Sequence, residues 1–184
     1  NQLERVAAGL VGIGDEAFRE TAAEVVPEGR TLLGYDRLHG LWQAVRNAAG
    51  VEGSMAELGS FRGGSAHFLM LATRRLHGSP RPTFVLDTFE GHPEHEIGDG
   101  DRLAGGGGQR AGKFSETSLE AVREYLRPFD EADVRRCVVP DGLAGLPGDH
   151  RYALVHLDMD LHGPTLRALE YFWPRMPAGA TSEI

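Results

Sequence analysis

The chain has 184 residues, a size typical of one domain with a single sizeable core. Its 41% hydrophobic and 25% charged residues fit a soluble globular protein and exclude disordered and fibrous classes. A net charge of −8 without a basic run argues against a nucleic-acid partner, and no apolar stretch is long enough to span a membrane. The one cysteine, Cys137, cannot form an intramolecular disulfide, so we expect a buried strand residue in a cytoplasmic protein.

Apolar spacing predicts helices and strands that alternate along most of the chain. In chain order we expect helices at 14–26 and 35–49, a strand at 54–58, a helix at 64–76, a strand at 83–86, a long loop at 88–115, a helix at 115–126, strands at 134–139 and 152–157, and a helix at 164–173. This order predicts an α/β fold with a mostly parallel sheet and helices on both faces, which binds ligands at the carboxyl ends of its strands.

A single domain is expected, with a helical cap over residues 1–50 and a ligand-binding core over residues 51–184. The turn Pro177-Ala178-Gly179-Ala180 normally leads into another strand, and few residues follow it. The final strands of such a fold are therefore expected to be missing from this chain.

A glycine-rich turn links the first strand to the next helix. The spacing of Gly59, Gly63 and Gly64 differs from the G-x-G-x-x-G of a dinucleotide site, and the carboxylate of Glu57 would repel a pyrophosphate. That carboxylate suits the ammonium group of S-adenosylmethionine, which has no phosphate, and glycines let the backbone approach such a ligand closely. The turn favours S-adenosylmethionine, with an ordinary tight turn and a solvated Glu57 as the alternative.

Asp87 ends the second strand, where an acid can accept both ribose hydroxyls of a nucleoside. This holds for NAD and for S-adenosylmethionine, so Asp87 does not choose between them; an Asx turn is the structural alternative. We expect the cofactor to contact residues at the turn and at the strand ends: Glu57, Gly59, Ser60, Arg62, Gly63, Ser65, Asp87, Thr88, Phe89, Asp141 and Gly142.

Two acids, Asp158 and Asp160, follow the fourth strand. Residues i and i+2 of an extended segment point to the same face, so the two carboxylates should project together. Such a pair repels itself unless a cation or shared proton relieves it, and Mg²⁺ prefers oxygen ligands. Acids also end strands as helix caps, so the pair alone leaves a metal site and a cap equally open.

Three motifs together resemble the macrocin O-methyltransferase family, over roughly residues 38–179. They are Glu57-Leu58-Gly59 with Arg62-Gly63-Gly64-Ser65-Ala66, then Asp87-Thr88-Phe89-Glu90-Gly91, then His156-Leu157-Asp158-Met159-Asp160-Leu161. Members of this family methylate sugar hydroxyls during antibiotic assembly. The resemblance implies a Rossmann-like class I methyltransferase fold, S-adenosylmethionine, and a divalent cation, usually Mg²⁺.

By motif position, the resemblance makes Asp158 a metal ligand and Asp160 the general base that deprotonates the acceptor. His162 stands where the family usually has Tyr, and we consider it as a helper base. Gly179-Ala180 replaces two glycines, and the adjacent acids with which the family completes its metal site are absent, with Glu183 at most a remnant.

The expected acceptor is a glycosylated small molecule, and the expected protein could form a homo-oligomer. The loop at residues 90–114 should close over cofactor and acceptor as a mobile lid. Two other functions stay open: a nicotinamide-dependent oxidoreductase on a similar sheet, and a non-catalytic methyltransferase-like binding module, which the missing acidic pair would favour.

Overall fold

The computed structural model describes residues 14–103 and 108–184. Its centre is a five-stranded, all-parallel sheet with the strand order β3-β2-β1-β4-β5. The strands are β1 (Ser54–Leu58), β2 (Thr83–Asp87), β3 (Ala132–Arg136), β4 (Tyr152–Leu157) and β5 (Thr181–Glu183). The sheet confirms the expected α/β, Rossmann-like architecture. Because the order reverses between β1 and β4, a crevice is expected at their carboxyl ends.

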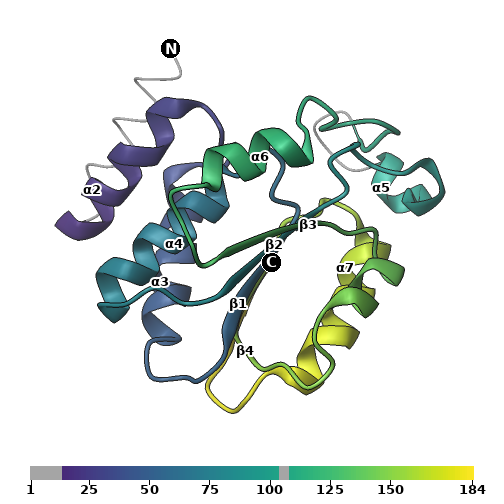
Figure 1. Ribbon diagram of the computed structural model, residues 1–184. Helices are drawn as coiled ribbons and strands as arrows, with labels where there is room; N and C mark the ends of the chain where they lie inside the picture. Colours follow the sequence, from purple (N-terminus) through teal and green to yellow (C-terminus); the bar gives the residue numbers. More distant parts are fainter. Residues whose placement is uncertain (1–13, 104–107) are drawn as a thin grey trace.

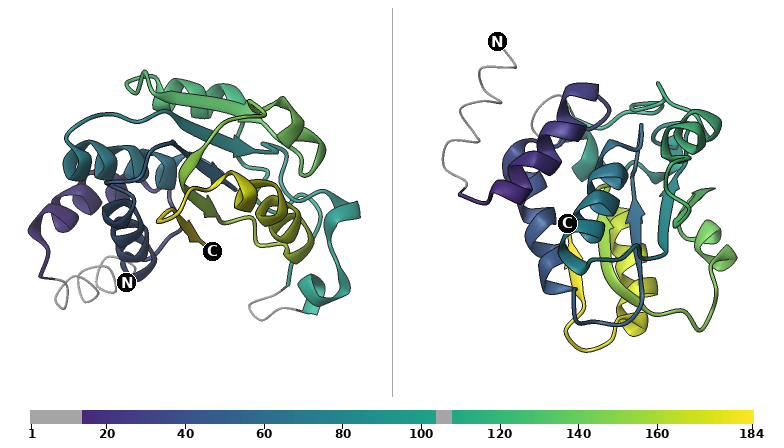
Figure 2. Two further views of the ribbon diagram at one scale, coloured as in Figure 1. Left: turned by 90° about the horizontal axis from the view of Figure 1, so that it is seen from below. Right: turned by 60° about the vertical axis from the view of Figure 1, so that its left-hand side comes forward.

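Helices cover both faces of the sheet, as Figures 1 and 2 show. The α-helices are α2 (Glu16–Val25), α3 (Tyr35–Asn47), α4 (Gly64–His77), α5 (Asp99–Leu103), α6 (Leu119–Leu126) and α7 (His162–Phe172). Within residues 14–103 and 108–184, short 3₁₀ helices occur at Val26–Glu28, Glu94–Glu96, Asp141–Gly145 and Trp173–Arg175. No described helix has the length and apolarity needed to cross a membrane.

Strand alternation explains how the two faces are packed. Met55 of β1 and Leu154 of β4 pack under α2, α3 and α4, whereas Ala56 and Val155 pack on the other face with α7. A third cluster joins α4 and α6 to β2 and β3. Every residue of β1 and β4 is buried, as a strand covered on both faces requires.

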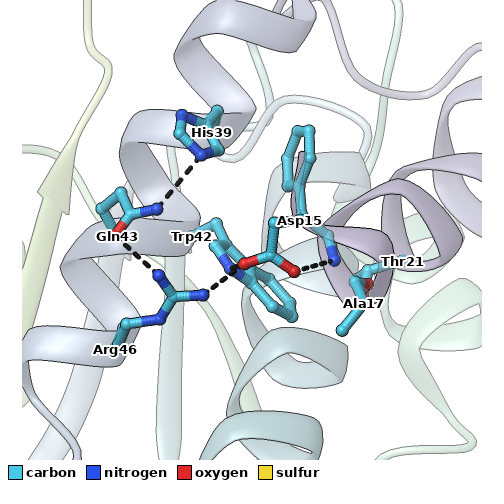
Figure 3. Close-up of polar contacts among 8 residues, drawn as sticks. Asp15, Ala17, Thr21, His39, Trp42, Gln43 and Arg46 are labelled. Carbon is cyan, nitrogen blue, oxygen red and sulfur yellow. Dashed lines mark hydrogen bonds and ion pairs between the residues drawn. The ribbon is translucent and has the colours of Figure 1, made fainter. Parts of the chain in front are cut away.

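Asp15 fastens the first described helix to α3, and Figure 3 shows its carboxylate between the two helices. One carboxylate oxygen caps α2 by accepting from the N–H of Phe18 at 3.1 Å. The other accepts from Nε1 of Trp42 at 2.9 Å and from the guanidinium of Arg46. These contacts hold the N-terminal end of α2 against α3.

Several element boundaries differ from those expected. The strand expected at 134–139 is at Ala132–Arg136, so Cys137 follows the strand instead of lying in it. The helix expected from Ser115 begins at Leu119, because Ser118 is the residue whose side chain caps it, accepting from Ala121 N. The last helix begins at His162, two residues before the expected Pro164.

Two segments contain regular structure that the apolar spacing did not indicate. The expected loop at 88–115 contains α5 and a 3₁₀ turn in its described part. Asp101 of α5 accepts from the backbone N–H of His162 at 3.0 Å, which attaches this segment to the start of α7. The turn before Ala180 does lead into a further strand, β5, which pairs with β4.

Candidate functional site

One cavity lies at the carboxyl ends of β1, β2 and β4. Among the residues expected to form the site, the cavity wall contains Gly59, Ser60, Ser65, Asp87, Thr88, Asp158 and Asp160. It also contains residues that were not among the expected site residues: Arg30, Thr31, Leu32, Leu33 and Arg37 at and before α3; His92, Pro93, Glu96 and Phe114 from the segment after β2; and Cys137, Val138, Val139, Met159, Leu161 and Pro164.

The glycine turn is shaped by close backbone contacts. Gly59 has φ +90°, and a Cβ there would lie 2.2 Å from the carbonyl oxygen of Asp158. Only glycine fits this position, because both the positive φ and the neighbouring strand end exclude a side chain. Gly63, also at positive φ, precedes α4 without any side-chain cap. The first N–H groups of α4 are therefore free of side-chain caps beside the cavity.

Asp87 ties the end of β2 to the turn. One carboxylate oxygen accepts from Phe61 N at 2.8 Å and the other from Phe89 N at 2.7 Å. Burial raises the pKa of Asp87, and these two backbone hydrogen bonds oppose that rise. Each oxygen keeps acceptor capacity beyond its one backbone bond, so the carboxylate can still accept from a ligand hydroxyl.

Glu57 is fully buried and lies outside the cavity wall. It pairs in register with His156 of β4, which in turn pairs with Glu183 of β5. Glu57 Oε1 is 3.0 Å from His156 Nδ1, and His156 Nε2 is 3.8 Å from Glu183 Oε2. Burial opposes a charge on His156, but the hydrogen bond and charge of Glu57, with Glu183, raise the pKa of the imidazole.

Asp158 and Asp160 both line the cavity, although β4 ends at Leu157 and strand alternation does not reach them. Asp158 Oδ1 accepts from Arg37 Nη2 of α3 at 2.7 Å. Asp160 has φ +59°, an uncommon conformation for a residue with a side chain. Strain of this kind is concentrated at functional positions, and Phe61 beside the cavity shares it with φ +50°.

Several expected site residues lie away from the cavity wall: Glu57, Arg62, Gly63, Phe89, Asp141, Gly142 and His162. His162 is exposed at the start of α7. Gly142 packs against Cys137, where a Cβ would lie 2.8 Å from the thiol. Cys137 itself lines the cavity, and burial with the charge of Asp87 raises its pKa to about 11, so the thiol is protonated near neutral pH.

Within the described residues, His, Cys, Asp and Glu form no group of three or more that could hold a metal ion. Asp158 and Asp160 are oxygen donors of the kind that suits a hard cation. They are only two, and a guanidinium already neutralises one of them. These two described donors do not by themselves make up a cation site.

The parallel sheet, the glycine turn and the acid at the end of β2 are the features of a Rossmann-like, nucleoside-binding class of α/β protein. The O-methyltransferase NovP has a similar structure, with a TM-score of 0.63 and 29% identity over 80% of this chain and 63% of that one. The calicheamicin methyltransferase CalS11 shares the fold, with a TM-score of 0.67 at 20% identity over 97% of this chain and 74% of that one.

Residues 7–182 match the model of the macrocin-O-methyltransferase (TylF) family, and the chain belongs to that family. It is 36% identical to 8-demethyl-8-(2,3-dimethoxy-alpha-L-rhamnosyl)-tetracenomycin-C 4'-O-methyltransferase of Streptomyces olivaceus, over 81% of this chain and 59% of the relative. It is 31% identical to demethyldecarbamoylnovobiocin O-methyltransferase of Streptomyces niveus, over 90% of this chain and 66% of the relative. The chain therefore spans less than two thirds of the length of these relatives.

Proposed function

We propose that the protein transfers a methyl group from S-adenosylmethionine to a hydroxyl of a sugar on a natural product. The observation that carries the proposal is one cavity with a nucleoside-type acid, Asp87, and a second carboxylate, Asp160, in its wall. The family supports the reaction class, and relatives named for glycosylated compounds support the acceptor class. The same relatives weigh against a nicotinamide-dependent oxidoreductase.

The cavity wall suits the cofactor. Gly59 leaves backbone space that a Cβ would fill, and Asp87 offers acceptor capacity for ribose hydroxyls. The hydroxyl of Ser60 is buried and has no hydrogen-bond partner among the described residues, so it can serve a ligand. Glu57, behind the wall, would act on the ammonium group only through an intervening atom such as water.

The reaction needs a nucleophilic oxygen and an acceptor for its proton. Bound S-adenosylmethionine supplies a methyl group on a sulfonium, whose sulfur keeps the electron pair when the carbon–sulfur bond breaks. We assign the proton of the attacking sugar hydroxyl to the carboxylate of Asp160, which receives no hydrogen bond from the described residues. The cavity contributes by holding the hydroxyl in line, and the segment at residues 90–114 by excluding water as a lid.

A divalent cation, most suitably Mg²⁺, remains part of the proposal, with Asp158 as one ligand. When bound, such an ion would lower the pKa of coordinated hydroxyls. Titration with Mn²⁺, followed by electron paramagnetic resonance, tests this directly in wild type and in Asp158→Ala. Equal Mn²⁺ binding by both proteins would reject Asp158 as a ligand.

We also propose that the protein is cytoplasmic and that it can assemble as a homo-oligomer.

The test of function combines binding with turnover. Calorimetry should show binding of S-adenosylhomocysteine and no comparable binding of NADH, and labelled methyl groups should appear on an alkyl α-L-rhamnoside or a related glycoside. Binding of NADH alone would favour the oxidoreductase. Cofactor binding without methyl transfer to any glycoside would favour the non-catalytic binding module.

A further inference from the structure

Residues 30–33, here called the strap, lie on the wall of the cavity although they have no regular secondary structure. The strap lies directly on the start of α4. A Cβ at Gly64 would be 2.4 Å from Thr31 N and 2.6 Å from the carbonyl carbon of Arg30. The strap thus packs against the end of the glycine turn, and its position shapes that end of the proposed cofactor site.

A polar cluster outside the cavity holds the N-terminal end of the strap. The guanidinium of Arg30 lies 4.1 Å from the ring centroid of Tyr125 on α6, and it donates to the carbonyl of Arg62 at 3.3 Å. The Tyr125 hydroxyl donates to the carboxylate of Glu28, two residues before the strap. His67 of α4 lies 2.5 Å from the same hydroxyl.

The chemistry of Tyr125 explains why this cluster can hold the strap. Burial, with the hydrogen bond and charge of Glu28, raises the pKa of Tyr125, so the phenol stays protonated and remains a donor. Because the phenol donates its O–H to Glu28, the phenolic oxygen can accept a hydrogen bond from Nδ1–H of His67. One ring thereby connects α6, α4 and both sides of the bend at Gly29.

We propose that Tyr125 is a positioning residue for cofactor binding, which fixes the strap over the glycine turn without touching the ligand. Ordering an irregular segment costs conformational entropy, and a segment that is ordered beforehand spares the ligand that cost. The inference rests on the proposed function for its choice of ligand. Tyr125 itself is absent from the cavity wall.

Tyr125→Phe tests the proposal because it removes both hydroxyl contacts and keeps the ring under Arg30. Tyr171→Phe is the matched control, since Tyr171 also carries an arginine over its ring, Arg175 at 3.9 Å, and lies outside the cavity wall. We expect Tyr125→Phe to weaken S-adenosylhomocysteine binding by about tenfold in calorimetry, as loss of a charge-assisted hydrogen bond would do. Tyr171→Phe should leave the affinity unchanged.

Limited trypsin digestion gives a readout that needs no cofactor. Cleavage after Arg30, measured by mass spectrometry relative to cleavage after the exposed Arg110, should become severalfold faster in Tyr125→Phe and remain unchanged in Tyr171→Phe. Glu28→Gln, which weakens the same contact from its other end, should change both readouts in the same direction by a smaller factor.

The outcomes separate this inference from the proposed function. Faster cleavage at Arg30 together with weaker binding supports the positioning role. Unchanged cleavage in Tyr125→Phe, or faster cleavage with unchanged affinity, overturns it. If wild type bound no S-adenosylhomocysteine, the proposed function would fail and the role in cofactor binding with it, while the cleavage rates would still show whether Tyr125 holds the strap.

Discussion

The two sides of the cavity, one proposed for the cofactor and the other for the acceptor, are built differently. On the cofactor side, both oxygens of Asp87 accept backbone N–H groups, and Gly59 packs against the backbone of Asp158. On the acceptor side, Asp158 is held by a half-exposed arginine, and Asp160 adopts a strained backbone conformation without a hydrogen bond to its carboxylate from the described residues. The first side is preorganised by its main chain, whereas the second keeps reactive groups available.

This difference fits the two tasks that methyl transfer sets. A cofactor is the same molecule in every turnover, so a rigid binding site formed by the backbone suits it. A base must change protonation during the reaction, so a carboxylate saturated with hydrogen bonds would serve poorly. Substitutions on the acceptor side should therefore reduce turnover with little loss of binding, and substitutions on the cofactor side should reduce binding or stability first.

Asp160→Asn should have the largest effect. It removes the proton acceptor while keeping nearly the same shape, so we expect turnover to fall by roughly 10²–10⁴-fold, the usual contribution of a general base. S-adenosylhomocysteine affinity in calorimetry should stay within about twofold. Asp149→Asn, at an exposed position outside the cavity wall, is the control. Near-normal turnover of the Asp160 variant would move the search for a base to His162.

Gly59→Ala should have the next largest effect, on stability as well as cofactor binding. The new Cβ would meet the Asp158 carbonyl at 2.2 Å in a backbone with φ +90°. We expect a loss of about 2–5 kcal/mol in the free energy of unfolding by urea titration, the combined cost of backbone strain and overpacking. Gly29→Ala is a matched control, because Gly29 has φ +67° with nothing within 4 Å. If both variants lost equal stability, the close approach to β4 would be irrelevant.

The sequence was most informative where function depends on strand ends. The apolar periods located every strand of the sheet up to β4, and the carboxyl ends of those strands contain Gly59, Asp87, Asp158 and Asp160. The metal role of Asp158, the base role of Asp160 and the lid remain predictions.

Other features depend on contacts that no local pattern records. The strap at residues 30–33 reaches the cavity through irregular backbone, for which there is no periodic signal. The partner of Glu57 is His156, 99 residues away, and only the strand register brings the two together. A solvated Glu57 was one alternative, and the structure buries this side chain completely instead.

Asp87→Asn should weaken cofactor binding by about 1–3 kcal/mol, since a ligand hydroxyl would lose its charged acceptor. We choose Asn over Ala because the amide oxygen of Asn can still accept from one of the two backbone N–H groups, which limits the structural disturbance. Calorimetry with S-adenosylhomocysteine measures the change, and Asp133→Asn on the edge strand β3 controls for loss of one acid. Equal affinities for wild type and Asp87→Asn would remove Asp87 from the cofactor side.

The smallest effect is expected at His156. This residue lies on β4, two positions before Asp158, and it contacts Glu57 on β1, two positions before Gly59. Although burial opposes its charge, Glu57 and Glu183 raise the pKa of His156 in the folded state above its unfolded value of about 6.5. Its stabilising contribution is then fully present below pH about 6.5 and is lost as the pH rises through the folded pKa. We expect the difference in free energy of unfolding between wild type and His156→Gln to be largest in acid and to shrink with rising pH. His77→Gln should show the opposite slope, because burial lowers the pKa of His77 and its protonation opposes folding. Parallel slopes for the two variants would mean that Glu57 and Glu183 do not raise the pKa of His156 in the folded protein, and that the contact stabilises only by packing.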